Sequence, residues 1–372
     1  MQKKLRRLGL GLFRMGIGGL VGYQSVMPLL LSAKRQYPGL ADSALLFLGL
    51  FIGSFLGGFI VSVALHELGH VVAGKIAGFR FAFMIFWPVK ITRRGSSGLS
   101  IKLSLRNGIG MGGLAGMVPV AGLPMRQAYL TMLSGGPLAS LLVALLAGSA
   151  AIGMGLGQNL FGGVFWIFAI TSLLLFFLTI IPMKAGGFLS DGAAIRLLKK
   201  GSPEEIDRYV ALLECGSAIA AGTRPAGLNP SHVETLLTSG PEEPVFFQAR
   251  HFAFLHAADS NNLTGAREFM EEIQQNLEKS PVIMRGRYQL DAAWLEAREG
   301  NADKARSLLS KANQGLTEPC ELKFIEAEIA LSEGKTDDAR RLAGESLGLI
   351  DHSMIPGAHE FARQRLLQIS QI

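Results

Sequence analysis

The first part of the chain alternates long apolar runs with short basic segments. The apolar runs lie near residues 15–33, 44–70, 127–157 and 160–183. Each run is long enough to cross a bilayer, because about 20 apolar residues at 1.5 Å per residue span the hydrocarbon core. A helix buried in a soluble core rarely stays uncharged over such a length. We therefore expect four membrane-spanning helices, and a removed signal peptide is the alternative for the first run.

Two segments with a different period separate the second apolar run from the third. Val89–Arg93 and Leu99–Arg106 alternate apolar with polar residues, and Gly95–Gly98 lies between them. A period of two is typical of strands, so a β-hairpin is predicted. Its edge could hold an extended substrate, and a purely structural hairpin is the alternative. Asn107–Met125 is so rich in glycine that we expect a re-entrant loop rather than a helix.

The second half of the chain opens with signals for the start of a helix. Ser202 is suited to cap the helix, Pro203 to occupy its first position, and Glu205 to complete a capping box. The four prolines of residues 222–244 are typical of a linker. Residues 201–244 are therefore expected to be one helix followed by a linker.

An internal repeat follows the linker. Residues 299–308 match residues 333–342 at an offset of 34, and a weaker copy begins at Asn261. A helix, a glycine turn and a second helix with this period resemble tetratricopeptide repeats. We expect Asn261, Gly300 and Gly334 to end the first helix of each pair in the left-handed conformation. An ordinary helical bundle is the alternative for residues 245–372.

Charge divides the chain into two unequal parts. Residues 1–200 contain 19 lysines and arginines but three acidic residues, whereas residues 201–372 contain 17 basic and 26 acidic residues. A basic half that is also apolar and rich in glycine is typical of a membrane domain rather than of a nucleic-acid binder. Its basic residues flank the apolar runs, which by the positive-inside rule places those flanks in the cytosol. Cys215 and Cys320 are too few for a disulfide framework.

The candidate chemistry lies at the end of the second apolar run. His66, Glu67 and His70 form an H-E-x-x-H motif, and a helix places the two histidines on one face. This spacing suits a shared Zn²⁺, with Glu67 as the base for a metal-bound water. The acidic residues of the first 200 positions are Asp42, Glu67 and Asp191, and ionisable groups in apolar segments are costly enough that few persist without a function. Polar residues that cap a membrane helix are the alternative.

Asp191 is the candidate for the third ligand. The topology derived from charge places it at the same membrane level as His66 and His70. A catalytic zinc takes three protein ligands and leaves a fourth position for water, and two histidines with one carboxylate are a known set. The alternative is that Asp191 caps the helix predicted over residues 192–200.

Together these features resemble the site-2 protease family of intramembrane zinc metalloproteases. The resemblance covers roughly residues 44–200: the H-E-x-x-H motif at a membrane-helix end, a later span that contains Gly136 and Pro137, and a terminal Asp191-Gly192. It implies that the two histidines and Asp191 bind zinc. It also implies that Glu67 acts as general base and acid in peptide hydrolysis.

The chain departs from the family pattern at two positions. The family's Gly-Pro-x-x-Asn motif ends here in Ser140, and its Asn-x-x-Pro motif begins here with Thr179. The family asparagines orient substrate or stabilise the oxyanion. Ser140 and Thr179 are therefore the candidates for these roles.

The sequence thus predicts a mainly α protein with three parts. Residues 1–200 form a polytopic helical membrane metalloprotease core with a small β-hairpin, residues 201–244 form the helix and linker, and residues 245–372 form a soluble α-helical repeat domain. The expected function is zinc-dependent cleavage of membrane-anchored protein or peptide substrates, within the lipid bilayer of a bacterial plasma membrane. The repeat domain is expected in the cytosol, where it would dock a protein partner or select substrates. A non-catalytic scaffold that recruits partners through the repeats is the alternative.

Overall fold

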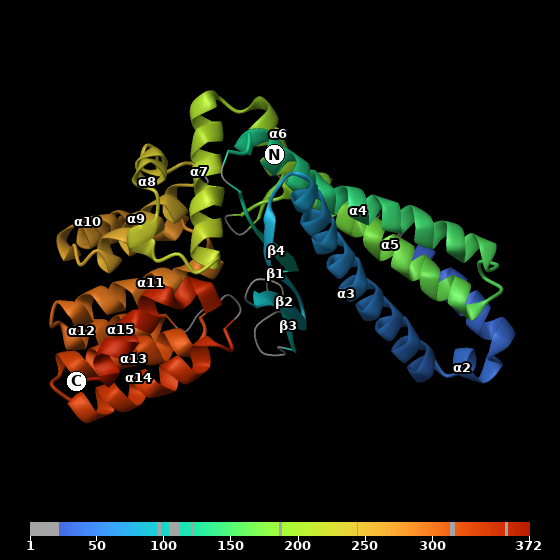
Figure 1. Cartoon of the computed structure of the whole chain (residues 1–372). Coiled ribbons are helices and arrows are strands. Elements are labelled where there is room, and N and C mark those ends of the chain that lie inside the picture. Colours follow the sequence, from blue (N-terminus) through green and yellow to red (C-terminus); the bar gives the residue numbers. More distant parts are fainter. Residues whose placement is uncertain are drawn as a thin grey trace, which may run out of the picture. The chain divides into compact units, whose positions relative to one another are not determined.

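The computed structural model describes residues 22–94, 98–103, 112–120, 122–185, 188–243, 245–312, 317–353 and 356–372. This described part is mainly helical and contains a four-stranded antiparallel sheet (Figure 1). The chain divides into two compact units. The first runs to Val72 and resumes from Ser134 to Ile181, and the second comprises Ala73–Leu133 and Pro182–Ile372.

Three helices of the described chain are long and apolar enough to cross a membrane. They are α3 (Ala44–Ile76), α4 (Met125–Gly153) and α5 (Leu160–Ile180). They confirm the helices expected near 44–70, 127–157 and 160–183. The run at 15–33 lies partly outside the described residues; residues 22–36 are helical, and the short α2 (Pro38–Asp42) follows.

The helices of the first unit pack through small residues and hydroxyl groups. Ser62 on α3 is buried and lies 3.2 Å from the Thr171 hydroxyl and 2.7 Å from the Ser172 hydroxyl, both on α5. Gly163 on α5 lies against Leu29, where a Cβ atom would come 2.9 Å from the Leu29 Cα. Such contacts are typical of helices in apolar surroundings, where small side chains permit close approach and hydroxyls bond across the interface.

The sheet of the second unit confirms the predicted hairpin where it is described, and residues 95–97 and 104–106 of the prediction lie outside the described residues. Its strand order is β3 (Gly98–Leu103), β2 (Val89–Arg94), β1 (Arg80–Phe86), β4 (Gly113–Val118), and all neighbours are antiparallel. The prediction of a re-entrant loop over Asn107–Met125 was wrong for the residues of β4, which pair with β1, and residues 107–111 and 121 lie outside the described residues. Gly116 explains the difference, because its missing side chain leaves room for the Phe83 ring across the ladder.

The helices next to the sheet partly correct the sequence analysis. They are α6 (Asp191–Lys200), preceded by the two-residue strands β5 (Lys184–Ala185) and β6 (Phe188–Leu189), then α7 (Pro203–Ala220), η1 (Pro225–Gly227) and α8 (Pro230–Leu237). The Ser202–Glu205 capping box is present as predicted. The linker prediction was wrong for α8, since Asn229 caps this helix and Val233 and Leu236 pack in an apolar core shared with α7 and α9. An apolar cavity of about 370 Å³ is lined by residues of both β4 and α7.

The remaining helices form antiparallel pairs around one continuous core (Figure 1). They are α9 (Phe246–Asp259), α10 (Leu263–Gln275), η2 (Leu277–Lys279), α11 (Val282–Arg298), α12 (Ala302–Lys311), α13 (Pro319–Ser332), α14 (Thr336–Ile350), η3 (Pro356–His359) and α15 (Glu360–Ser370). Asn261, Gly300 and Gly334 end α9, α11 and α13 with φ of 57°, 84° and 75°. These left-handed residues confirm the predicted turns.

Two lysines of the sheet contact the end of α14. Lys90 on β2 donates to the Ser353 carbonyl, and Lys102 on β3 donates to the Asp351 carbonyl at 2.7 Å. Burial lowers the pKa of Lys90 to about 8, with the nearby Glu318 carboxylate opposing the change. The sheet and the last helical pairs are therefore joined by hydrogen bonds to the main chain.

Candidate metal centre

Helix α3 supplies three of the predicted site residues. His66, Glu67 and His70 are 4 %, 6 % and 8 % exposed, so all three side chains are buried. The four-residue spacing places the two imidazoles on one helix face, and their planes stand edge to face at 86°. The Nε2 atoms of His66 and His70 lie 3.2 Å apart.

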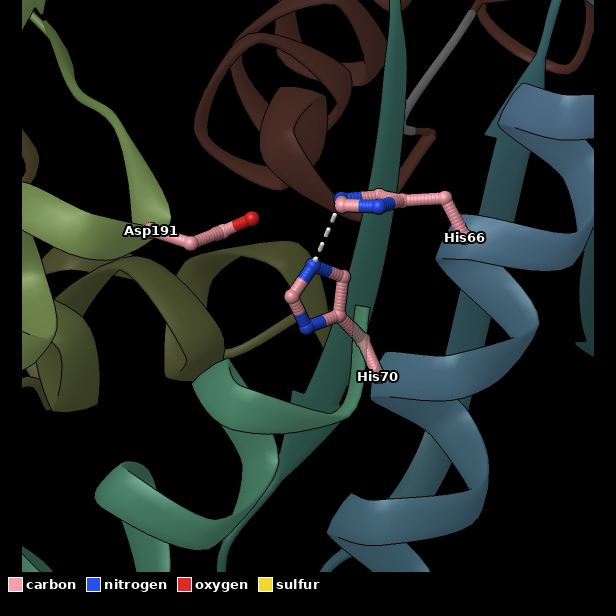
Figure 2. A group of neighbouring side chains, drawn as sticks. All are labelled: His66, His70 and Asp191. Atoms are coloured by element: carbon pink, nitrogen blue, oxygen red, sulfur yellow. Dashed lines mark hydrogen bonds between the residues drawn. The ribbon is translucent and has the colours of Figure 1, made fainter. Parts of the chain in front are cut away.

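This separation fits two ligands of a common ion. Two nitrogens bound to a tetrahedral Zn²⁺ at about 2.0–2.1 Å lie about 3.3 Å apart. The histidine pair therefore already has the nitrogen–nitrogen spacing that a tetrahedral ion requires, and Figure 2 shows the two Nε2 atoms facing each other.

Helix α4 packs against the two histidines at a glycine, which has no side chain. A Cβ atom on Gly136 would lie 2.7 Å from His66 Nε2 and even nearer to His70 Nε2. A Cβ atom on Gly69 of α3 would come similarly close to the Gly135 carbonyl oxygen. Pro137 follows within the helix and has no N–H to donate to the carbonyl four residues earlier. The Gly-Gly-Pro stretch therefore brings the α4 backbone against the imidazoles.

Ser140 contacts the first histidine. It is 1 % exposed, and its Oγ lies 2.9 Å from His66 Nδ1. With a metal on Nε2, the ring proton is on Nδ1, which then donates to the serine hydroxyl. Such a partner fixes the tautomer and the orientation of a ligating imidazole. The substrate or oxyanion role of Ser140 stays a prediction beside this contact.

Thr179 lies in the last turn of α5, and its hydroxyl is bonded to its own helix. The Oγ1 atom donates to the carbonyls of Leu175 at 3.0 Å and Phe176 at 3.2 Å. A threonine hydroxyl has one proton, so these carbonyls compete with any substrate oxygen for it. The substrate role of Thr179 stays a prediction.

Asp191 is the first residue of α6 and is not its cap. Ser190 holds that position, with its Oγ accepting from the Ala193 N–H at 3.2 Å. The structure therefore excludes the alternative in which Asp191 is the N-cap of this helix. At its far end, α6 receives a hydrogen bond from Arg126, whose Nε donates to the Leu198 carbonyl at 2.7 Å.

His66, His70 and Asp191 together form a group that could hold a metal ion. One ligand atom from each residue lies within 4.8 Å of the others, and Figure 2 shows the carboxylate directed toward the imidazoles. Two imidazole nitrogens and a carboxylate oxygen suit Zn²⁺, which accepts both donor types. These donors therefore fit the metal that the sequence analysis expected.

No family model, curated protein or solved structure matched this chain. Sequence reasoning found the histidines, Glu67 and Asp191, but it missed the contact of Gly136 with the imidazoles and that of Ser140 with His66. The Gly136-Pro137 pair was visible as a motif, although its spatial neighbour was not.

Proposed function

We propose that this protein is an integral-membrane zinc endopeptidase. The observation that carries the proposal is the group formed by His66, His70 and Asp191, next to the buried Glu67. Two further features support it. The group includes the end of an apolar helix long enough to cross a membrane, and the three donors are those of a catalytic zinc site with one open position.

The residues divide the chemistry between them. A zinc ion, when bound, would polarise the scissile carbonyl and acidify a water molecule. Glu67 takes the proton of the attacking water and passes it to the leaving amine. By accepting from Nδ1, Ser140 favours the His66 tautomer in which Nε2 carries no proton and can coordinate. Gly136 leaves the space that the imidazoles occupy.

The proposed substrates are membrane-anchored proteins or peptides, held extended against the sheet. Strand β3 is an edge strand, and Leu99, Ile101 and Leu103 along it are exposed. An exposed edge offers unpaired backbone groups to an extended peptide, while apolar side chains suit a segment drawn from lipid. Replacing Ile101 with proline removes a backbone donor from this strand. The proposal predicts slower cleavage by this variant than by Ile101→Val.

The proposed location is a bacterial plasma membrane, with the C-terminal helical domain in the cytosol. Basic residues after α3 and after α5 support this orientation. A cysteine introduced at the exposed Glu204 tests it, because the native Cys215 and Cys320 are buried. An impermeant maleimide should label it in inverted vesicles and not in intact spheroplasts. Labelling in spheroplasts would contradict the orientation.

The experiment that tests the activity is Glu67→Gln in the full chain. Membranes from cells that carry the wild type or the variant are compared for new protein N-termini within membrane-spanning segments. We expect termini that are specific to the wild type and reduced at least about 100-fold by Glu67→Gln, because general acid–base catalysis contributes roughly 10²–10⁴-fold. The exposed Glu204→Gln is the matched control and should cleave as the wild type does.

Metal content of the purified proteins completes the test. Glu67→Gln should retain as much zinc as the wild type, whereas a His66→Ala/His70→Ala double variant should lose one zinc per chain. A Glu67→Gln protein with normal zinc and normal cleavage would remove the assigned role of Glu67. A wild type that produces no termini of its own would favour the scaffold function.

A further inference from the structure

A second set of potential ligands lies in the helical domain, where the proposed protease chemistry does not use it. Glu318, Cys320 and His359 each offer one ligand atom, and these atoms lie within 4.8 Å of one another. Glu318 and Cys320 come from the start of α13, and His359 comes from the end of η3. Cys320 is 3 % and His359 7 % exposed, and Glu318 is partly buried, so two of the three ligands are buried beside an apolar core.

The distances within this cluster match a tetrahedral arrangement. His359 Nε2 lies 3.3 Å from Glu318 Oε2, and Cys320 Sγ lies 3.7 Å from the same oxygen and 4.0 Å from His359 Nε2. Ligands bound to zinc at about 2.0–2.3 Å lie about 3.3–3.6 Å apart. The nitrogen–oxygen distance already agrees, and the sulfur needs to move by a few tenths of an ångström. We propose that Glu318, Cys320 and His359 form a second binding site for a thiophilic divalent cation such as Zn²⁺.

Further polar groups lie next to the three ligands. Glu321 Oε1 lies 3.9 Å from His359 Nδ1, which is an ion-pair distance longer than a hydrogen bond. Ser353 Oγ lies 2.8 Å from His359 Nε2, within hydrogen-bond distance of the nitrogen that would coordinate the ion. The Cys320 carbonyl accepts from Ser346 Oγ at 2.7 Å. These contacts surround the three ligands with polar groups.

The site is structural in kind. Cys320 and His359 are buried and Glu318 is partly buried, so the ligands lie inside the helical domain. An ion here would join the first turn of α13 to the residue that precedes α15. Lys90 also donates to the Ser353 carbonyl, so the ion would lie next to the contact between the sheet and the helical domain. The cation would therefore hold the last helices in place beside the sheet.

Cobalt binding to the full chain tests this inference. A thiolate bound to Co²⁺ produces a near-ultraviolet charge-transfer band, whereas the His66, His70 and Asp191 group contains no sulfur and cannot produce one. We expect the band in the metal-stripped wild type after Co²⁺ addition and its loss in Cys320→Ala. Cys215→Ala is the matched control and should keep the band, because Cys215 lies in a separate core on α7.

Two further measurements keep the result interpretable if Cys320→Ala folds poorly. His359→Gln retains the thiol and should weaken Co²⁺ binding at least tenfold, and zinc content should fall by one ion per chain. The band should persist in the His66→Ala/His70→Ala protein, which separates this site from the proposed protease centre. Absence of the band in the wild type, or its persistence in Cys320→Ala, would overturn the second site.

Discussion

His66 and Ser140 are 74 residues apart in the chain, yet His66 Nδ1 and Ser140 Oγ lie 2.9 Å apart in a buried contact. The contact leaves Nε2 as the coordinating atom of the ring. Ser140→Ala should therefore lower zinc affinity by roughly 10–100-fold, the usual effect of removing an outer partner of a ligating histidine. Competition with a chromophoric chelator measures this change. Ser172→Ala removes a different buried hydroxyl from the same unit and should leave zinc affinity unchanged.

The space beside the imidazoles gives a second prediction. Gly136→Ala introduces a Cβ atom 2.7 Å from His66 Nε2, which is closer than side-chain atoms tolerate. We expect the variant to lose zinc from the first site and to lose cleavage with it. Gly148→Ala on the same helix is the control, because its Cβ would meet Ala169 at an ordinary 3.8 Å. Equal zinc contents in the two variants would contradict the proposed position of the ion.

The repeat turns give a third prediction. Gly300 has φ of 84° with open space around its Cβ position, so alanine there is strained by its backbone alone. Gly300→Ala should destabilise the helical domain by about 1–2 kcal/mol. Gly344→Ala also enters open space, but inside α14, and should stabilise it by about 0.5–1 kcal/mol. Thermal unfolding of the purified full chain should show opposite shifts for the two variants.

Acid should act on the helical domain through Asp291. Burial would raise the pKa of this carboxyl, but Arg287 and His251, 3.2 and 2.8 Å from its Oδ2, hold the pKa below the ordinary value. A lowered folded pKa contributes stability above the unfolded pKa of about 3.9, and this contribution disappears as the pH falls through the folded pKa.

Asp291→Asn should consequently be less stable than the wild type by about 1–3 kcal/mol at neutral pH, since a charged hydrogen-bond partner is lost. The difference should shrink as the pH falls below about 4. Denaturant unfolding across this pH range measures it, and the exposed Asp207→Asn should follow the wild type throughout. A difference that is constant with pH would show that the charge of Asp291 does not cause it.

Local rules predicted the features that depend on neighbours in sequence. The spacing of His66 and His70 placed both rings on one helix face, alternation predicted the β2–β3 hairpin, and Gly300 and Gly334 marked the repeat turns. Each depends on a few adjacent residues, so periodicity and turn preferences suffice. The prediction of Asp191 as a ligand needed more than local rules. Span length and flanking charge predicted that its segment lies at the same membrane level as the histidines.

Features made by distant residues were missed or misread. The glycines of β4 lower strand propensity, and the strand forms because Phe83 fills the space above Gly116. Helix α8 arises in a proline-rich segment because Val233 and Leu236 have an apolar core to join. The cluster of Glu318, Cys320 and His359 spans 42 positions without a ligand spacing, so a pattern search does not find it. Tertiary contacts decide all three.

The lysines that join the sheet to the end of α14 bind main-chain oxygens, at Asp351 and Ser353. A carbonyl is present whatever side chain its residue carries. Evolutionary drift at positions 351 and 353 would therefore spare this attachment, while drift at Lys90 or Lys102 would break it. A mutational scan would therefore detect these two hydrogen bonds at the lysine donors and not at the residues whose carbonyls accept them.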